Sequence, residues 1–166
     1  MIAAAFLLLG LAQGIAPAPP SRTIVATIRA GATEGTVEVE VRNVSSAQVD
    51  TRGEATLMLR PLDPGQHPLY DGLLWTSVDL NSGKCDGFFA GRPSPRVVFE
   101  AGGAREVRVN LMKLKWSLSP NWVWQPREFW ELAGPGEYEV VLYLNLDLSP
   151  REHPWPQKTR VRIAGQ

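Results

Sequence analysis

Cysteine is nearly absent from this sequence, and histidine is scarce. Cys85 is the single cysteine among 166 residues, so no internal disulfide can form, and a disulfide-dense secreted scaffold is excluded. One cysteine and two histidines, His67 and His153, are also too few to predict a zinc or copper site. We therefore expect neither a metal nor a cofactor.

The sequence also lacks an excess of charge of either sign. It holds 17 basic and 17 acidic residues, which gives a formal net charge of zero. Proteins that bind DNA or RNA usually present a basic surface to the phosphate backbone. A chain of zero net charge removes that electrostatic argument, and we expect no nucleic-acid partner.

No familiar catalytic pattern is present. The sequence contains no paired-carboxylate motif, no phosphate-cradling loop and no Ser–His–Asp arrangement. Cys85 with His67 or His153 could form a nucleophile–base pair. No supporting pattern surrounds these residues, and an unreactive thiol with two surface histidines is the favoured interpretation. We expect no catalytic residue and no enzymatic activity.

One acidic segment is loosely similar to a calcium loop. Asp79, Asn81 and Gly83 are spaced two residues apart, and Asp86 follows. The EF-hand pattern needs more carboxylates and a closing glutamate. A solvated turn is therefore the favoured interpretation of this segment.

Only one long apolar run occurs, at residues 1–14. It is too short for a membrane span, which needs about 20 residues, but it suits the core of a secretory signal, with small residues at Ala12 and Gly14. The Pro-rich segment 15–22 follows and would end any helix there. We predict a signal peptide (1–14), a spacer (15–22) and one domain (23–166). The alternative is a buried N-terminal helix.

Export has two consequences for the mature chain. Its location would be secreted or periplasmic. No second long apolar stretch exists, so we expect no stable membrane insertion of the mature chain.

The rest of the chain alternates between apolar and polar residues, as strands do. In residues 36–44 the pattern places Val37, Val39 and Val41 inward and the charged residues between them outward. Similar patterns predict eight strands, which favours an all-β antiparallel sandwich of about 7–9 strands. The predicted strands are residues 23–30, 36–44, 55–60, 73–80, 96–100, 105–111, 136–144 and 158–164.

The strand at residues 136–144 gives the clearest signal. Pro135 and Gly136 make a turn, after which Tyr138, Val140, Leu142 and Leu144 fall on one face. Glu139, Val141 and Tyr143 fall on the other face, and their mixed character predicts a partly covered outer surface.

Tryptophan is concentrated in one insertion. Trp116, Trp122, Trp124 and Trp130 lie in the irregular segment 113–132, where one short helix over 127–132 is expected after Pro126. Aromatic rings stack on sugars and on apolar side chains, so we predict that these four tryptophans bind a ligand or partner. The alternative is a satellite core in which the rings fold under the loop.

Three short motifs carry a family resemblance: Asn-Val-Ser-Ser at 43–46, Arg-Glu-Val-Arg-Val at 105–109 and Pro-Gly-Glu-Tyr-Glu-Val at 135–140. Together they resemble a bacterial Ig-like domain and are similar to the modules that include the bacterial intracellular proteinase inhibitor family. The resemblance implies an Ig-like sandwich. It places Tyr138 at the tyrosine corner, where we expect its hydroxyl to bond to nearby backbone.

These observations predict an exported, non-catalytic, Ig-like binding or assembly module of the cell envelope. Its partner would be a protein or a glycan. The alternatives are a carbohydrate-binding module that uses a tryptophan platform, a protease inhibitor, and a small hydrolase with carboxylates that converge from distant positions.

Overall fold

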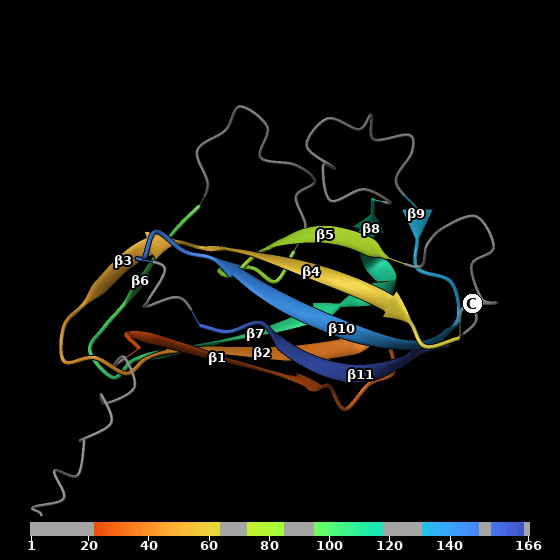
Figure 1. Cartoon of the computed structure of the whole chain (residues 1–166), viewed down its shortest axis with the longest axis horizontal. Helices are drawn as coiled ribbons and strands as arrows, with labels where there is room; N and C mark the ends of the chain where they lie inside the picture. The colour runs from red at the N-terminus through yellow and green to blue at the C-terminus, as the bar shows by residue number, and fades with distance from the viewer. Residues whose placement is uncertain (1–21, 64–72, 85–94, 118–130, 150–153, 165–166) are drawn as a thin grey trace, which may run out of the picture.

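The computed structural model describes residues 22–63, 73–84, 95–117, 131–149 and 154–164, which form antiparallel strands and one short 3-10 helix (Figure 1). The elements are β1 (Ile24–Ala30), β2 (Thr36–Asn43), β3 (Val49–Arg52), β4 (Glu54–Pro61), β5 (Leu74–Asp79), β6 (Arg96–Phe99), β7 (Ala104–Asn110), η2 (Leu111–Lys113), β8 (Lys115–Trp116), β9 (Glu131–Leu132), β10 (Gly136–Asn145) and β11 (Gln157–Ile163).

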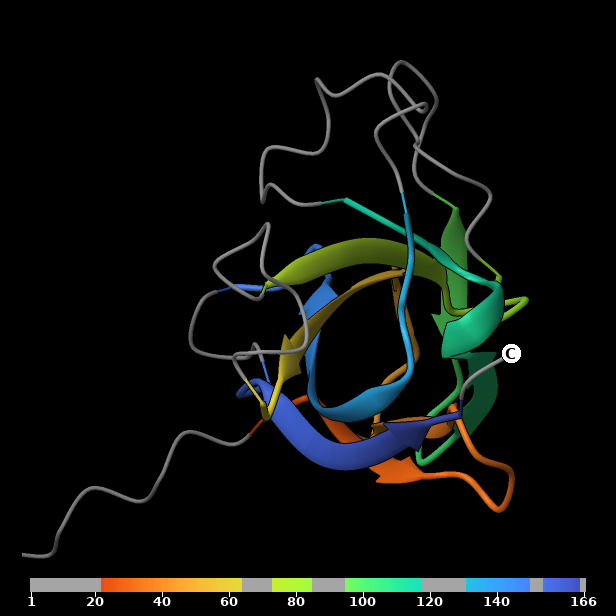
Figure 2. The same cartoon turned by 90° about the vertical axis from the view of Figure 1, so that its right-hand side faces the viewer.

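Two sheets enclose one core. Their strand orders are β1-β2-β7 and β11-β10-β4-β5, and all pairs are antiparallel. Strands β1 and β11 run side by side, so the sheets curve around a shared interior (Figure 2). These orders match strands A-B-E and G-F-C-C′ of an immunoglobulin sandwich. The predicted all-β, Ig-like antiparallel sandwich is confirmed.

The alternation expected from the sequence places the core residues. Val37, Val39 and Val41 of β2 are at most 2% exposed. The inner residues of β10 are also buried, and Val141 on its outer face is only 8% exposed. Alternation therefore places one face of β2 and of β10 in the core, although Val141 on the outer face is also shielded from solvent. The inner residues of β10 are Tyr138, Val140, Leu142 and Leu144.

All eight predicted strands are present, and three further strands were not predicted. β3 pairs with β6, and β8 pairs with β9. The short helix expected over 127–132 falls mainly outside the described residues. Its last two residues, Glu131–Leu132, form β9 instead, because they pair with β8.

Tyr138 forms the hydrogen bond expected of a tyrosine corner. Its ring is fully buried, and its hydroxyl donates to the backbone carbonyl of Gly134 at 2.8 Å. Burial raises the pKa of this phenol above its ordinary value, because the charged form loses its solvation. The bond fixes the entry of the chain into β10.

Asn43, the first residue of the Asn-Val-Ser-Ser motif, is a buried polar anchor. Its amide nitrogen donates to the carbonyls of Ala47, Phe99 and Glu100 at 2.6, 3.2 and 3.1 Å. Its amide oxygen accepts from the nitrogen and hydroxyl of Ser45. The side chain is 0% exposed and ties the end of β2 to the turn between β6 and β7.

The expected signal peptide (1–14) lies outside the described residues, as does the spacer except for Arg22. Within the described ranges, no helix is both long and apolar enough to span a bilayer.

Candidate functional site

Trp116, the first of the four tryptophans predicted to bind a ligand, is not a binding residue. Trp116 is 0% exposed, and its indole nitrogen donates to the carbonyl of Leu111 at 3.2 Å. A ring packed into the core with its donor satisfied cannot stack on a ligand. Trp116 therefore takes the alternative role of a core residue. Trp122, Trp124 and Trp130 lie outside the described residues, so their role stays a prediction.

The acidic segment near Asp79 forms a hydrogen-bonded turn. The Asp79 carboxylate accepts from the backbone and side-chain nitrogens of Asn81 and from the Ser82 hydroxyl. Gly83 donates to the Asp79 carbonyl with a φ of 68°, which favours glycine. No cluster of metal-binding side chains occurs among the described residues. Cys85, Asp86, His67 and His153 lie outside them.

Two tryptophans that were not predicted as site residues face outward. Trp155 is 69% exposed, and the Arg22 guanidinium lies 5.7 Å from the centre of its ring, a cation–π distance. Trp75 is half-buried on the outer face of the four-stranded sheet, and its ring centre lies 6.2 Å from that of Tyr143.

The contact between Trp75 and Tyr143 depends on the strand order. β5 and β10 both neighbour β4, so their backbones are about 10 Å apart. Rings only 6.2 Å apart must lean toward one another above β4. Their planes differ by 32°, and both side chains are half-buried. We call this pair the aromatic platform.

Polar side chains border one end of the aromatic platform. The Ser77 hydroxyl donates to the Glu54 carboxylate at 2.6 Å. The Asn145 amide donates to the Thr56 hydroxyl at 2.9 Å. The strand registers place all four residues on the face that carries Trp75 and Tyr143. Amide, hydroxyl and carboxylate groups therefore lie beside the half-buried rings.

Basic side chains lie at the opposite end of the face that carries the aromatic platform. Glu139 accepts from Arg60 at 2.7 Å and pairs with Lys158 at 3.4 Å. Arg160 is the register partner of Glu139 on β11 and is exposed. Three cations thus gather around one carboxylate.

The Trp-rich insertion joins the described structure next to the aromatic platform. Trp75 and Ser117 exchange two backbone hydrogen bonds, both 2.8 Å long. Residues 118–130 follow Ser117 directly, and the chain returns at Glu131, which pairs with Trp116. Both ends of the insertion therefore lie at the β5 edge of the sheet.

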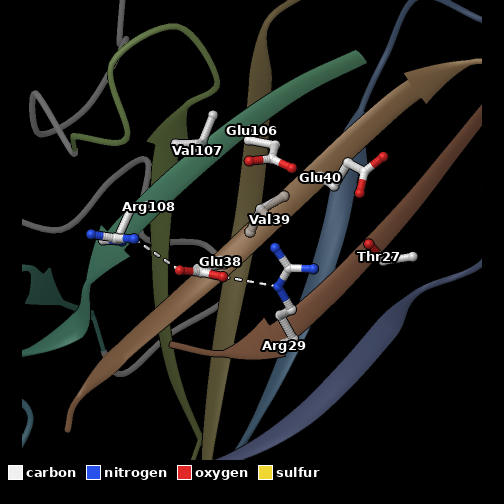
Figure 3. A pocket seen from close by; sticks show the side chains of 8 residues that line it. All are labelled: Thr27, Arg29, Glu38, Val39, Glu40, Glu106, Val107 and Arg108. Atoms are coloured by element: carbon white, nitrogen blue, oxygen red, sulfur yellow. Dashed lines mark hydrogen bonds and ion pairs between the residues drawn. The ribbon is translucent and has the colours of Figure 1, made fainter. Parts of the chain in front are cut away.

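The outer face of the other sheet is charged rather than aromatic. Glu38 lies between the guanidinium groups of Arg29 and Arg108, at 2.9 and 3.0 Å (Figure 3). Hydrogen bonds from Arg29 and then Arg108 hold the pKa of Glu38 below its ordinary value. Arg42 pairs with Glu40, which lies opposite Glu106. The face holds a shallow cavity of about 220 Å³.

The sequence did not predict that Trp75 and Tyr143 are in contact. The alternation of apolar and polar residues does indicate which face of its strand each ring occupies. Leu74, Thr76 and Val78 are buried, so strand parity alone places Trp75 on the outer face. Nothing in the sequence states that β4 lies between β5 and β10, and the pair exists only because of that order.

No protein-family model matches the sequence, and no curated protein matches it. Among the solved structures that match, two are weakly similar to this chain, each with a TM-score of 0.29. One is the ASH/PapD-like domain 7 of human CEP192, at 16% identity over 100% of this chain and 96% of that domain. The other is a β-glucosidase from Kluyveromyces marxianus in complex with glucose, at 11% identity over 86% of this chain and 15% of the enzyme. At these scores neither likeness supports a conclusion about function.

Proposed function

We propose that this protein is an exported, non-catalytic binding or assembly module that works at the cell envelope, either secreted or in the periplasm. Its partner is a protein or a glycan of that compartment. The proposal assigns recognition to the outer face of β5, β4 and β10, with the Trp-rich insertion beside it. The bacterial origin implied by the family resemblance is part of the same proposal.

One observation carries the proposal. Trp75 and Tyr143 lie together on a solvent-facing sheet surface, where aromatic side chains are not needed to fill the core. Tryptophan and tyrosine are enriched among residues that dominate binding energy, since each offers a large apolar area and few rotatable bonds. Ig-like sandwiches present such faces on a rigid scaffold.

Binding is tested by sedimentation of the purified protein with isolated bacterial cell envelopes. We expect the wild-type protein to be retained and the Trp75→Ala variant to be retained about tenfold less, the effect of one lost aromatic contact. Trp155→Ala is the matched control, because Trp155 is also exposed but lies outside this face. Equal retention of wild-type protein and Trp75→Ala would contradict the assignment.

Export is tested separately. Residues 1–22 are fused to a reporter enzyme that is active only after translocation across the bacterial inner membrane. The export proposal expects reporter activity and a shortened fusion protein. Full-length, inactive fusion protein inside the cell would support the buried-helix alternative.

The family resemblance makes protease inhibition the competing function. A panel of proteases is titrated with the protein, and stoichiometric loss of protease activity would replace the binding-module proposal. Unchanged protease activity together with envelope binding would support it.

The prediction that Trp122, Trp124 and Trp130 are exposed can be tested by iodide quenching of tryptophan fluorescence. The test requires a variant that lacks Trp75 and Trp155, the two outward-facing tryptophans. Iodide quenches exposed indoles, and Trp155 is 69% exposed in any case. In a Trp75→Phe/Trp155→Phe variant, with Trp116 buried, iodide-sensitive fluorescence would come from the insertion. Unquenched fluorescence in that variant would support the satellite-core alternative.

A further inference from the structure

We propose that the aromatic platform, together with Lys158 and Arg160, binds an anionic polysaccharide. Sugar rings lie over Trp75 and Tyr143, and the carboxylates of the polymer lie beside the two basic side chains. This inference rests on the proposed function, because it names the ligand of the same face.

The first argument is the layout of the face. Trp75, Met58, Val141 and Lys158 are successive register partners across β5, β4, β10 and β11. Three strand spacings place the two ends of this row about 14 Å apart. An extended polymer can therefore reach the aromatic and the basic ends of the row at once.

The second argument is the aromatic area of the face. Trp75 and Tyr143 place two neighbouring half-buried rings on the same outer surface, with ring centres 6.2 Å apart. The C–H face of a sugar ring can pack against such rings. The neighbouring Glu54 and Asn145 place a carboxylate and an amide where sugar hydroxyls need hydrogen-bond partners.

The third argument is charge. Arg60 and Lys158 share the single carboxylate of Glu139. Arg160 makes no ion pair with any residue in the part of the chain that the structure describes. Glu137 faces Arg162 in the register, and Arg162 pairs with Glu34. The four cations at this end therefore meet three carboxylates, and the one positive charge left over favours an anionic polymer over a neutral one.

The outer face of the other sheet gives an internal comparison. There the arginines and glutamates are equal in number, and Glu38 and Glu40 are both paired. That face offers no uncompensated cation and no aromatic ring, so it does not compete for the same ligand. Its basic residue Arg108 is 73% exposed and supplies a matched control.

The test compares polygalacturonate with the same polymer after reduction of its carboxylates to alcohols, by titration calorimetry. We expect the reduced polymer to bind at least about tenfold more weakly, since each lost charge contact weakens binding about threefold. Trp75→Ala should bind polygalacturonate about tenfold more weakly. Lys158→Gln/Arg160→Gln should bind it about tenfold more weakly and with less salt dependence. Arg108→Gln and Trp155→Ala should bind like the wild type.

The outcomes separate this inference from the proposed function. Equal binding of the two polymers, or wild-type affinity in Trp75→Ala, overturns the inference. Envelope binding that is lost on protease treatment and kept after glycan digestion overturns the inference while the binding-module function stands. No binding to any envelope material overturns both. The melting temperature of each variant verifies folding before its affinity is read.

Discussion

On the outer face of β1, β2 and β7, charged side chains pair with one another, whereas on the outer face of β5, β4 and β10 two aromatic rings lie side by side. Both sheets bury similar aliphatic residues between them. The charged face is internally satisfied, with Glu38 held by two arginines. The aromatic face leaves half-buried rings at the surface, and along its β11 border Arg160 is exposed and has no ion pair among the described residues.

This difference underlies our proposal that one outer surface of the sandwich is functional and the other structural. In each strand the inward residues define the sandwich, and the outward residues are free to differ. On the charged face, the arginines and glutamates pair with one another. A face with half-buried aromatic rings gains free energy when a partner covers the area that is still exposed. The comparison is therefore the basis for our proposal that one sheet carries recognition and that the other supports it.

The largest expected effect contrasts the tryptophan inside the core with the one on the aromatic face. Trp116→Ala should lower the free energy of unfolding by about 3–5 kcal/mol, because it empties a large buried volume. Trp75→Ala should cost about 1 kcal/mol, the scale of a surface aromatic pair. Urea denaturation measures both values. Equal losses would mean that Trp75 is a structural residue and would break the comparison.

The next largest loss of stability is expected at Asn43, the last residue of β2. Asn43→Ala should cost about 3 kcal/mol, because it leaves buried carbonyls without donors. Asn110→Ala is a matched control: its side chain accepts one bond from Met112, and the loss should be about 1 kcal/mol. Thermal and urea denaturation would show whether Asn43→Ala loses more stability than Asn110→Ala. A smaller loss at Asn43 than at Asn110 would show that its network is dispensable.

A smaller effect is expected at the tyrosine corner. Tyr138→Phe removes the hydroxyl that bonds to Gly134 and should cost about 1 kcal/mol. Tyr143→Phe is the control on the outer face of the same strand and should leave stability unchanged while keeping the ring of the aromatic platform. If Tyr138→Phe unfolds at the same urea concentration as the wild type, the corner bond contributes nothing.

The smallest effect tests the charged face through its pH dependence. The pKa of Glu38 is lowered by hydrogen bonds from Arg29 and then Arg108, so its stabilising contribution is complete above the unfolded value, about 4.3. It is lost as the pH falls through the lower folded value. Glu38→Gln should therefore be less stable than the wild type at neutral pH, and the difference should shrink in acid.

Glu106→Gln is the control for that measurement. Glu106 lies opposite Glu40 in the register, and removing one of two facing like charges should not destabilise the sheet. A stability difference between Glu38→Gln and wild type that stays constant from neutral to acid pH would contradict the role given to the two arginines.

Alternation in the sequence predicts the long strands, because each has several residues over which the period of two can be read. β8 and β9 have two residues each, too few to show a period. The four residues of β3, Val-Asp-Thr-Arg, include only one apolar residue, so they show no alternation either. They exist because a partner strand lies within hydrogen-bonding distance, which is a property of the folded chain.

The site is less predictable for the same reason. The concentration of tryptophans in residues 113–132 predicted a binding site there. Trp116 is instead buried in the core, where its indole nitrogen donates to the carbonyl of Leu111. Glu38 receives hydrogen bonds from residues 9 and 70 positions away. Contacts between strands depend on sheet order and register, and neither can be read from local composition.

The network around Asn43 has a practical consequence for producing the protein. Asn43, Val44 and Ser45 match the acceptor tripeptide for N-linked glycosylation. In the folded chain the acceptor nitrogen is buried and donates to three carbonyls, so an oligosaccharyltransferase can modify it only before folding. A glycan attached then could not be accommodated where β2 ends. A host with this modification pathway should therefore yield misfolded protein, and a host without it should yield the native sandwich.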